Sequence, residues 1–165
     1  MLARGLTLLE LLVTIAILAI LVSIGIPSFT RQIASSRTLA ATDQLLQAVQ
    51  LARTTAIAKN RGTTIKKAGN WEAGWSIFYD ENMDGVQDAN DQVITTGEVL
   101  QSVLITATGP LANHVSFLGT GQSRSGGSLG IGSFTICPTD NGQGYKLILS
   151  ASGRLRREKI DAGDC

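Results

Sequence analysis

The C-terminal segment of this 165-residue chain carries cations spaced for a β-strand. Gly153 precedes Arg154 and Arg156, and Arg157 and Lys159 follow them. Because side chains alternate along a strand, Arg154 and Arg156 share one face about 6.7 Å apart, close to two phosphate steps of one DNA strand. Guanidinium groups bind phosphate oxygens through paired hydrogen bonds. A strand with this spacing could therefore grip a phosphate backbone without reading the bases.

Two further features qualify this basic segment. Arg157 and Lys159 fall on the opposite alternation, and we expect them to swing round and add charge to the same surface. No aromatic residue lies between 154 and 159, which favours duplex-backbone contact over stacking of single-stranded bases. The alternative is a solvated edge strand that its charge protects from aggregation. The basic residues between Arg53 and Lys67 either join this surface or cap a helix, and the sequence leaves both open.

An acidic turn follows the pattern of a calcium-binding loop. Its candidate oxygen ligands are Asp80, Asn82, Asp84, Asp88 and Asp91. The last ligand is Asp in place of the longer Glu, no flanking helices are expected, and such turns also form hairpins without metal. We therefore expect a structural hairpin and no cofactor, with calcium as the alternative.

Residues for enzymatic catalysis are sparse. His114 is the single histidine, and its short apolar strand pattern predicts a packed or hydrogen-bonded side chain. The chain has no nucleophile elbow, phosphate loop or metal-binding histidine pair. The net charge of +1 does not by itself indicate a nucleic-acid partner. We expect no enzymatic activity.

One long helix and a set of strands must position these groups. Apolar residues recur at helical spacing from 29 to 56, Pro27 is expected to kink the helix, and Asn60-Arg61-Gly62 predicts its end with Gly62 left-handed. From Thr63 the period becomes two, and the predicted strands are 63–67, 74–79, 92–96, 99–106, 114–118, 132–137, 145–150 and 154–159. The turn-rich residues 119–132 are predicted as a mobile loop. A helix followed by strands predicts an α+β fold with an antiparallel sheet over the helix.

The N-terminal segment places one carboxylate in an apolar helix. From Leu6 to Phe29 the only charge is Glu10, and this length is enough to span a hydrocarbon core of about 30 Å. A charge at the centre of such a helix costs about 3 kcal/mol, and less near the interface, so we expect a cation from another chain as its partner. Gly5 precedes the apolar run, so cleavage there would leave the helix on the mature chain, unlike an ordinary signal peptide.

These N-terminal residues carry a family resemblance. Gly5 and Leu6-Thr7-Leu8-Leu9-Glu10, with Pro27 ending the apolar run, resemble type IV prepilins and type II secretion pseudopilins. The resemblance implies prepilin-peptidase cleavage between Gly5 and Leu6, N-methylation of Leu6, and pairing of Glu10 with the Leu6 amine of a neighbouring subunit. Leu6 departs from the Phe of most members. The alternative is a simple single-span anchor with a Glu in its first turn.

The same resemblance implies a domain organisation and a location. Residues 1–5 are a leader, 6–29 a transmembrane and fibre-core helix, and 30–165 a globular pilin head that includes the rest of the helix. The expected location is the bacterial inner membrane, single-pass with the head in the periplasm, and then the pilus fibre or its tip. Partners are major and minor pilins, reached through the N-terminal helix.

The head narrows the resemblance. Trp71 and the run from Gly74 to Asp80 resemble the GspH/FimT group, and residues 152–156 resemble the Gly-Arg-x-Arg motif of FimT-type minor pilins, which is implicated in DNA binding. Cys137 and Cys165 are the only cysteines, and in an exported protein we expect them to form a disulfide, as in that subgroup. The expected function is a minor pilin that binds double-stranded DNA for natural transformation. The alternative is a minor pilin or GspH-like pseudopilin that primes or caps assembly without DNA.

Overall fold

The computed structural model describes residues 7–140 and 142–165, without the side chains of 23–28 and 162. One helix, α1 (Leu8–Lys59), opens the chain and continues without interruption past Pro27. Thr7 caps its start by accepting a hydrogen bond from the backbone N–H of Glu10 at 3.2 Å. The helix ends on Asn60, which has a left-handed φ of 49°. Asn60 therefore occupies the position predicted for Gly62, because Asn tolerates this conformation well.

The strands that follow form two antiparallel sheets. Those of the first sheet are β1 (Thr63–Ala68), β2 (Asn70–Tyr79), β3 (Val93–Thr96), β5 (His114–Phe117), β6 (Ser123–Ser125) and β7 (Ser128–Leu129). Those of the second are β4 (Val103–Ala107), β8 (Gly132–Pro138), β9 (Gly144–Leu149) and β10 (Leu155–Ile160). The first has the order β3-β2-β1-β5-β6-β7 and the second β10-β9-β8-β4. Two short 3-10 helices are η1 (Gly109–Ala112) and η2 (Ala162–Asp164). The predicted α+β fold is confirmed, with two sheets where one was expected.

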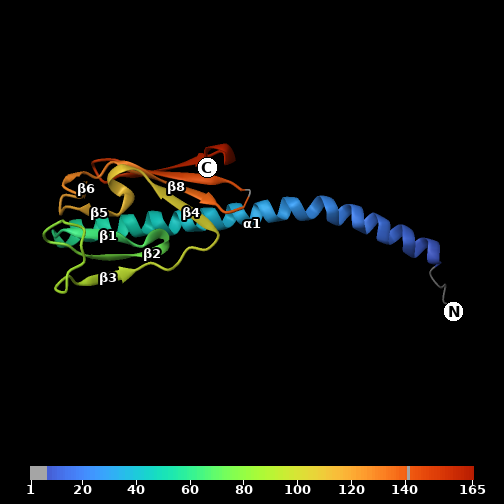
Figure 1. Ribbon diagram of the computed structural model, residues 1–165, viewed down its shortest axis with the longest axis horizontal. Coiled ribbons are helices and arrows are strands. Elements are labelled where there is room, and N and C mark those ends of the chain that lie inside the picture. Colours follow the sequence, from blue (N-terminus) through green and yellow to red (C-terminus); the bar gives the residue numbers. More distant parts are fainter. Residues whose placement is uncertain (1–6, 141) are drawn as a thin grey trace.

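The second half of α1 forms the core of the head. Its buried stripe includes Leu45, Val49, Ala52 and Ala56, which recur at helical spacing. Strands β1, β8 and β9 pack on this stripe, and the helix runs between the two sheets (Figure 1). The buried Trp71 ring meets Phe134 edge-on, with ring centroids 5.0 Å apart. Trp75 is also buried, so both tryptophans lie in the head.

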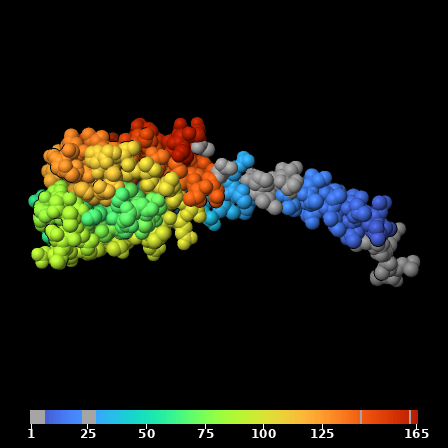
Figure 2. Space-filling view, viewed as in Figure 1, coloured from blue at the N-terminus to red at the C-terminus, as the bar shows by residue number. Residues whose placement is uncertain are grey.

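The first half of α1 projects from the head as a single rod (Figure 2). The large apolar side chains that are described here are exposed, among them Leu8, Leu9, Leu21 and Phe29. Within the described residues, no helix is both long and apolar enough to cross a membrane. The expected span, 6–29, includes residue 6 and the side chains of 23–28, which lie outside that description.

The stretch 119–132 differs from its prediction as a loop, because it contains the β6–β7 hairpin. Buried serines, and not apolar residues, attach this hairpin to the rest of the head. The Ser123 hydroxyl lies 2.9 Å from the carbonyl oxygens of both Gly130 and Ser150, and the Ser125 hydroxyl 2.9 Å from that of His114. Hydrogen bonds satisfy these polar groups, so the strands form without an apolar face.

Strand β10 is an edge strand that runs beside α1 in the opposite direction. Ser152, just before the strand, contacts Arg53 near the C-terminal end of α1. Arg157, within the strand, contacts Asp43, which lies closer to the N-terminus of the helix. The turn between β9 and β10 therefore lies at the end of the head that is remote from the N-terminus, where Figure 1 shows α1 ending. This placement puts Arg154 near the distal tip, whereas Arg157 lies farther back along the helix, beside Asp43.

Candidate functional site

The turn between β9 and β10 presents Arg154. The N–H of Gly153 donates to the Ser150 carbonyl at 2.9 Å, and the N–H of Ser150 donates to the Arg154 carbonyl at 3.0 Å. The Arg154 N–H in turn donates to the Ser150 hydroxyl at 3.2 Å. Gly153 has a φ of 75°, a left-handed conformation that glycine adopts without strain. The turn fixes the backbone from which the Arg154 side chain extends.

Arg53 of α1 locks this turn from beneath. Its Nε donates to the Gly121 carbonyl at 3.0 Å and its Nη2 to the Ser152 carbonyl at 3.1 Å. A Cβ on Gly153 would lie 2.2 Å from the Gly121 oxygen and 2.7 Å from Arg53 Nε. The glycine of the predicted motif is therefore required by close packing as well as by its φ. Arg53 contributes a positioning contact that the sequence did not reveal.

Arg154 and Arg156 differ in their partners. Arg154 is exposed, and among the described residues its side chain forms no ion pair. Arg156 is also exposed, but its Nη2 lies 2.7 Å from Glu158 Oε1. Leu155 pairs with Leu149 and packs against the core, as the alternation predicted. The free cation at the tip is thus Arg154, within the part of the chain that the structure describes.

The two remaining cations of the segment lie on the side of Leu155. Arg157 forms an ion pair with Asp43 of α1, and its guanidinium lies 5.9 Å from the centre of the Tyr145 ring. This contact corrects the expectation that Arg157 swings round to join Arg154, because the helix carboxylate holds it. Lys159 is exposed and lies opposite Tyr145 in the strand register.

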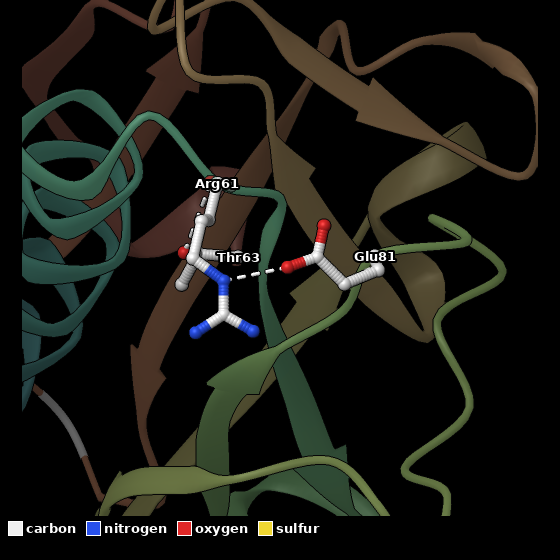
Figure 3. A network of polar contacts seen from close by, with 3 residues as sticks. All are labelled: Arg61, Thr63 and Glu81. Carbon is white, nitrogen blue, oxygen red and sulfur yellow. Dashed lines mark hydrogen bonds and ion pairs between the residues drawn. The ribbon is translucent and has the colours of Figure 1, made fainter.

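Arg61, from the second basic stretch, is also engaged locally. Its Nε lies 2.5 Å from Glu81 Oε1, and its carbonyl accepts a hydrogen bond from Thr63 at 3.5 Å (Figure 3). The guanidinium lies over the Tyr79 ring at 4.2 Å from the centroid. With Arg53 tied to the turn, the two arginines of this stretch have partners within the head.

The acidic turn is organised by hydrogen bonds to its own backbone and to β1. The proposed calcium ligands are Asp80, Asn82, Asp84, Asp88 and Asp91. Asp80 is buried, and its Oδ2 accepts hydrogen bonds from the Thr64 hydroxyl at 2.7 Å and the Gly85 N–H at 3.0 Å. Asp84 and Asp91 accept from the N–H groups of Val86 and Asp88. In the described residues, no three His, Cys, Asp or Glu side chains are grouped to hold a metal ion.

His114 is half-buried beside this turn. Its Nε2 accepts a hydrogen bond from the Gly126 N–H at 3.3 Å, and its ring packs on Gly85, where a Cβ would come within 2.4 Å. Burial lowers the pKa of His114 below its usual 6.5, against the raising effect of the Asp80 carboxylate. The expected hydrogen-bonded histidine is confirmed.

The expected disulfide between Cys137 and Cys165 is present, and it closes a separation of 28 residues. It joins the C-terminal end of the described chain to β8, beyond the end of β10 remote from Arg154. The processing residues Gly5 and Leu6 lie outside the described residues. Glu10 lies in the first turn of α1 with its side chain exposed.

Comparisons with known proteins agree with this architecture. The family described as "Type II transport protein GspH" matches residues 41–153, and the "Prokaryotic N-terminal methylation motif" matches residues 1–26. Two crystal structures of the type IV minor pilin FimU of Pseudomonas aeruginosa are similar in fold. One has 21% identity and a TM-score of 0.58 over 74% of this chain and 89% of FimU. The other has 22% identity and a TM-score of 0.55 over 73% of this chain and 91% of FimU. No curated protein matches.

Proteins of these families are structural and not enzymatic, are processed by prepilin peptidase and assemble with other pilins in a membrane-anchored fibre. The GspH match extends over more than half of the sequence, from the last part of α1 through β9 to Gly153, and it ends before Arg154 and β10. The N-terminal motif covers the part of the chain that precedes the head. The chain therefore belongs to the GspH family of type IV minor pilins and pseudopilins.

Proposed function

We propose that this minor pilin binds the phosphate backbone of double-stranded DNA through the β9–β10 turn and the outer side of β10. The observation that carries the proposal is Arg154, an exposed guanidinium with no ion pair to any described residue, on a turn that Arg53 locks in place. Arg156 follows two residues later on the same alternation, and Lys159 adds an exposed charge. A grip of this kind recognises phosphates and gives no base preference.

The resemblance of residues 152–156 to the Gly-Arg-x-Arg motif supports a role in DNA uptake during natural transformation. Cleavage between Gly5 and Leu6, N-methylation of Leu6 and pairing of Glu10 with a neighbour's amine would place the subunit in the fibre after a single-pass stage in the bacterial inner membrane. The head would then face the periplasm before it reaches the pilus or its tip. A tip position of the β9–β10 turn suits contact with external DNA, because the turn is remote from the N-terminal helix.

A subunit that only primes or caps assembly is the competing function. The ion pairs of Arg157 with Asp43 and of Arg61 with Glu81 favour it, because they use cations for internal structure. Calcium at the acidic turn would belong to either function, and the hydrogen bonds within that turn favour a purely structural hairpin.

The test is a titration of a fluorescein-labelled 20-base-pair duplex with the full chain in neutral detergent micelles, read by anisotropy. Two to four phosphate contacts predict that affinity falls about 10- to 150-fold between 50 and 200 mM salt. In the variant Arg154→Gln/Arg156→Gln we expect salt-sensitive binding to disappear. The matched control is Lys66→Gln/Lys67→Gln, which removes the same charge from β1 in the other sheet.

Equal losses in the two variants would mean that binding follows net charge and has no site at the turn. The absence of binding by the natural chain at 50 mM salt and high micromolar protein would refute a DNA receptor. The assembly function would then be preferred.

A further inference from the structure

Glu158 occupies the centre of the outer side of β10. It is two residues beyond Arg156 on the same strand, and its carboxylate binds that guanidinium at 2.7 Å. In the register of the sheet, Glu158 pairs with Lys146 of β9. A single carboxylate thus lies beside Arg156 on the surface that we assign to DNA, opposite Lys146 of β9.

We propose that Glu158 acts as an internal competitor of phosphate and sets the strength of DNA binding by masking Arg156. This inference rests on the proposed function. A carboxylate and a phosphate present the same kind of anionic oxygens to a guanidinium, so one Arg156 fork cannot serve both fully. Glu158 contacts Nη2 of Arg156, so DNA must displace this carboxylate before a phosphate can use the whole guanidinium.

The Arg156–Glu158 ion pair is exposed, so a ligand can displace it. The side chains of Arg156 and Glu158 are 68% and 40% exposed, so water and a ligand reach both. Exposed ion pairs of this kind are weak, and their loss changes an equilibrium about two- to fivefold. Arg157 differs in its position, because it lies on the helix side of the strand, where it pairs with Asp43. The chain thus has one permanently presented arginine, Arg154, and one that is conditionally available.

The experiment is a double-mutant cycle with Glu158→Gln, Arg156→Gln and both together, in the full chain in neutral detergent micelles against the same labelled duplex. We expect Glu158→Gln to bind about two- to fivefold more tightly than the natural chain. The slope of log K against log salt becomes steeper by up to about 0.9, because Arg156 contacts phosphate in a larger share of the bound complexes. In the Arg156→Gln background, Glu158→Gln should give little of this gain.

Asp161→Asn is the matched control, since it removes one negative charge near the end of β10 from a residue that pairs with no described cation. A gain of the same size in this control, or one that persists without Arg156, would show general electrostatics and overturn the masking. Unchanged affinity in Glu158→Gln, with the natural chain binding, would overturn it too. If neither chain binds DNA at low salt, the proposed function itself fails, which is a distinct result.

Discussion

Replacement of Arg53 by Met tests whether Arg53 positions the proposed DNA site without contacting DNA itself. The substitution keeps most of the side-chain volume and removes the bonds to the carbonyls of Gly121 and Ser152. Gly121 is buried, so its carbonyl would be left without a partner, whereas the exposed Ser152 carbonyl would bind water. Hydrogen bonds from charged donors contribute about 1.5–3 kcal/mol each when buried, so we expect a loss of about 2–3 kcal/mol in the free energy of unfolding.

The stability assay is urea unfolding in neutral detergent, followed by tryptophan fluorescence. Trp71 and Trp75 are both buried in the head, so the signal reports the head alone. Arg53→Lys serves as the control, because it keeps the charge and one donor but loses the fork, and its loss should be smaller.

The same variant has a specific effect on DNA binding. A loosened turn must be ordered when DNA binds, and ordering the backbone of one residue costs about 1–2 kcal/mol, which is about a five- to thirtyfold loss of affinity. The salt slope should not change in Arg53→Met, since no phosphate contact is lost, whereas Arg154→Gln should reduce its magnitude by about 0.9. A reduced slope in Arg53→Met would mean that Arg53 itself contacts phosphate, and our account of the turn would be wrong.

Three further predictions concern the stability of the head. Cys137→Ala/Cys165→Ala should cost about 3.5 kcal/mol in urea unfolding, the chain-entropy value for a loop of 28 residues, and an unchanged midpoint would refute the disulfide's role. Gly153→Ala should cost about 2 kcal/mol or more from its positive φ and its approach to the Gly121 carbonyl, measured by thermal unfolding against Ala151→Gly. Because burial lowers the pKa of His114, the unfolded chain binds a proton that the folded head excludes, so stability should fall from pH 7 to below pH 6, and His114→Gln should flatten this slope.

The sequence predicted the elements that have one apolar face. The change of period at Thr63 located β1, and apolar residues located β8 and β9. Alternating burial is clear in most of β9, whereas β1 and β8 also bury adjacent residues. The β6–β7 hairpin escaped this reasoning, since Ser123 and Ser125 are buried by hydrogen bonds to carbonyl groups that only the folded chain brings near.

The candidate site likewise contains contacts that have a local sequence signal and contacts that have none. Spacing predicted that Arg154 and Arg156 share a side, and the Glu158 pairing had a local signal, because residues two apart on a strand are neighbours. The pairing of Arg157 with Asp43 had none, since 114 positions separate the two residues along the chain. This ion pair follows from the tertiary placement of β10 beside α1, which no local pattern encodes.

The course of β10 beside α1 has a mechanical consequence. A pull on the β9–β10 turn, directed outward along the molecule, runs parallel to both the strand and the helix. It loads the hydrogen bonds to β9 and the contacts with Asp43 and Arg53 together in shear, because inter-strand bonds lie across the strand direction. The Cys137–Cys165 bond covalently prevents the strand from sliding out at its far end. Strand β10 thus transmits a pulling force from the tip of the head to α1.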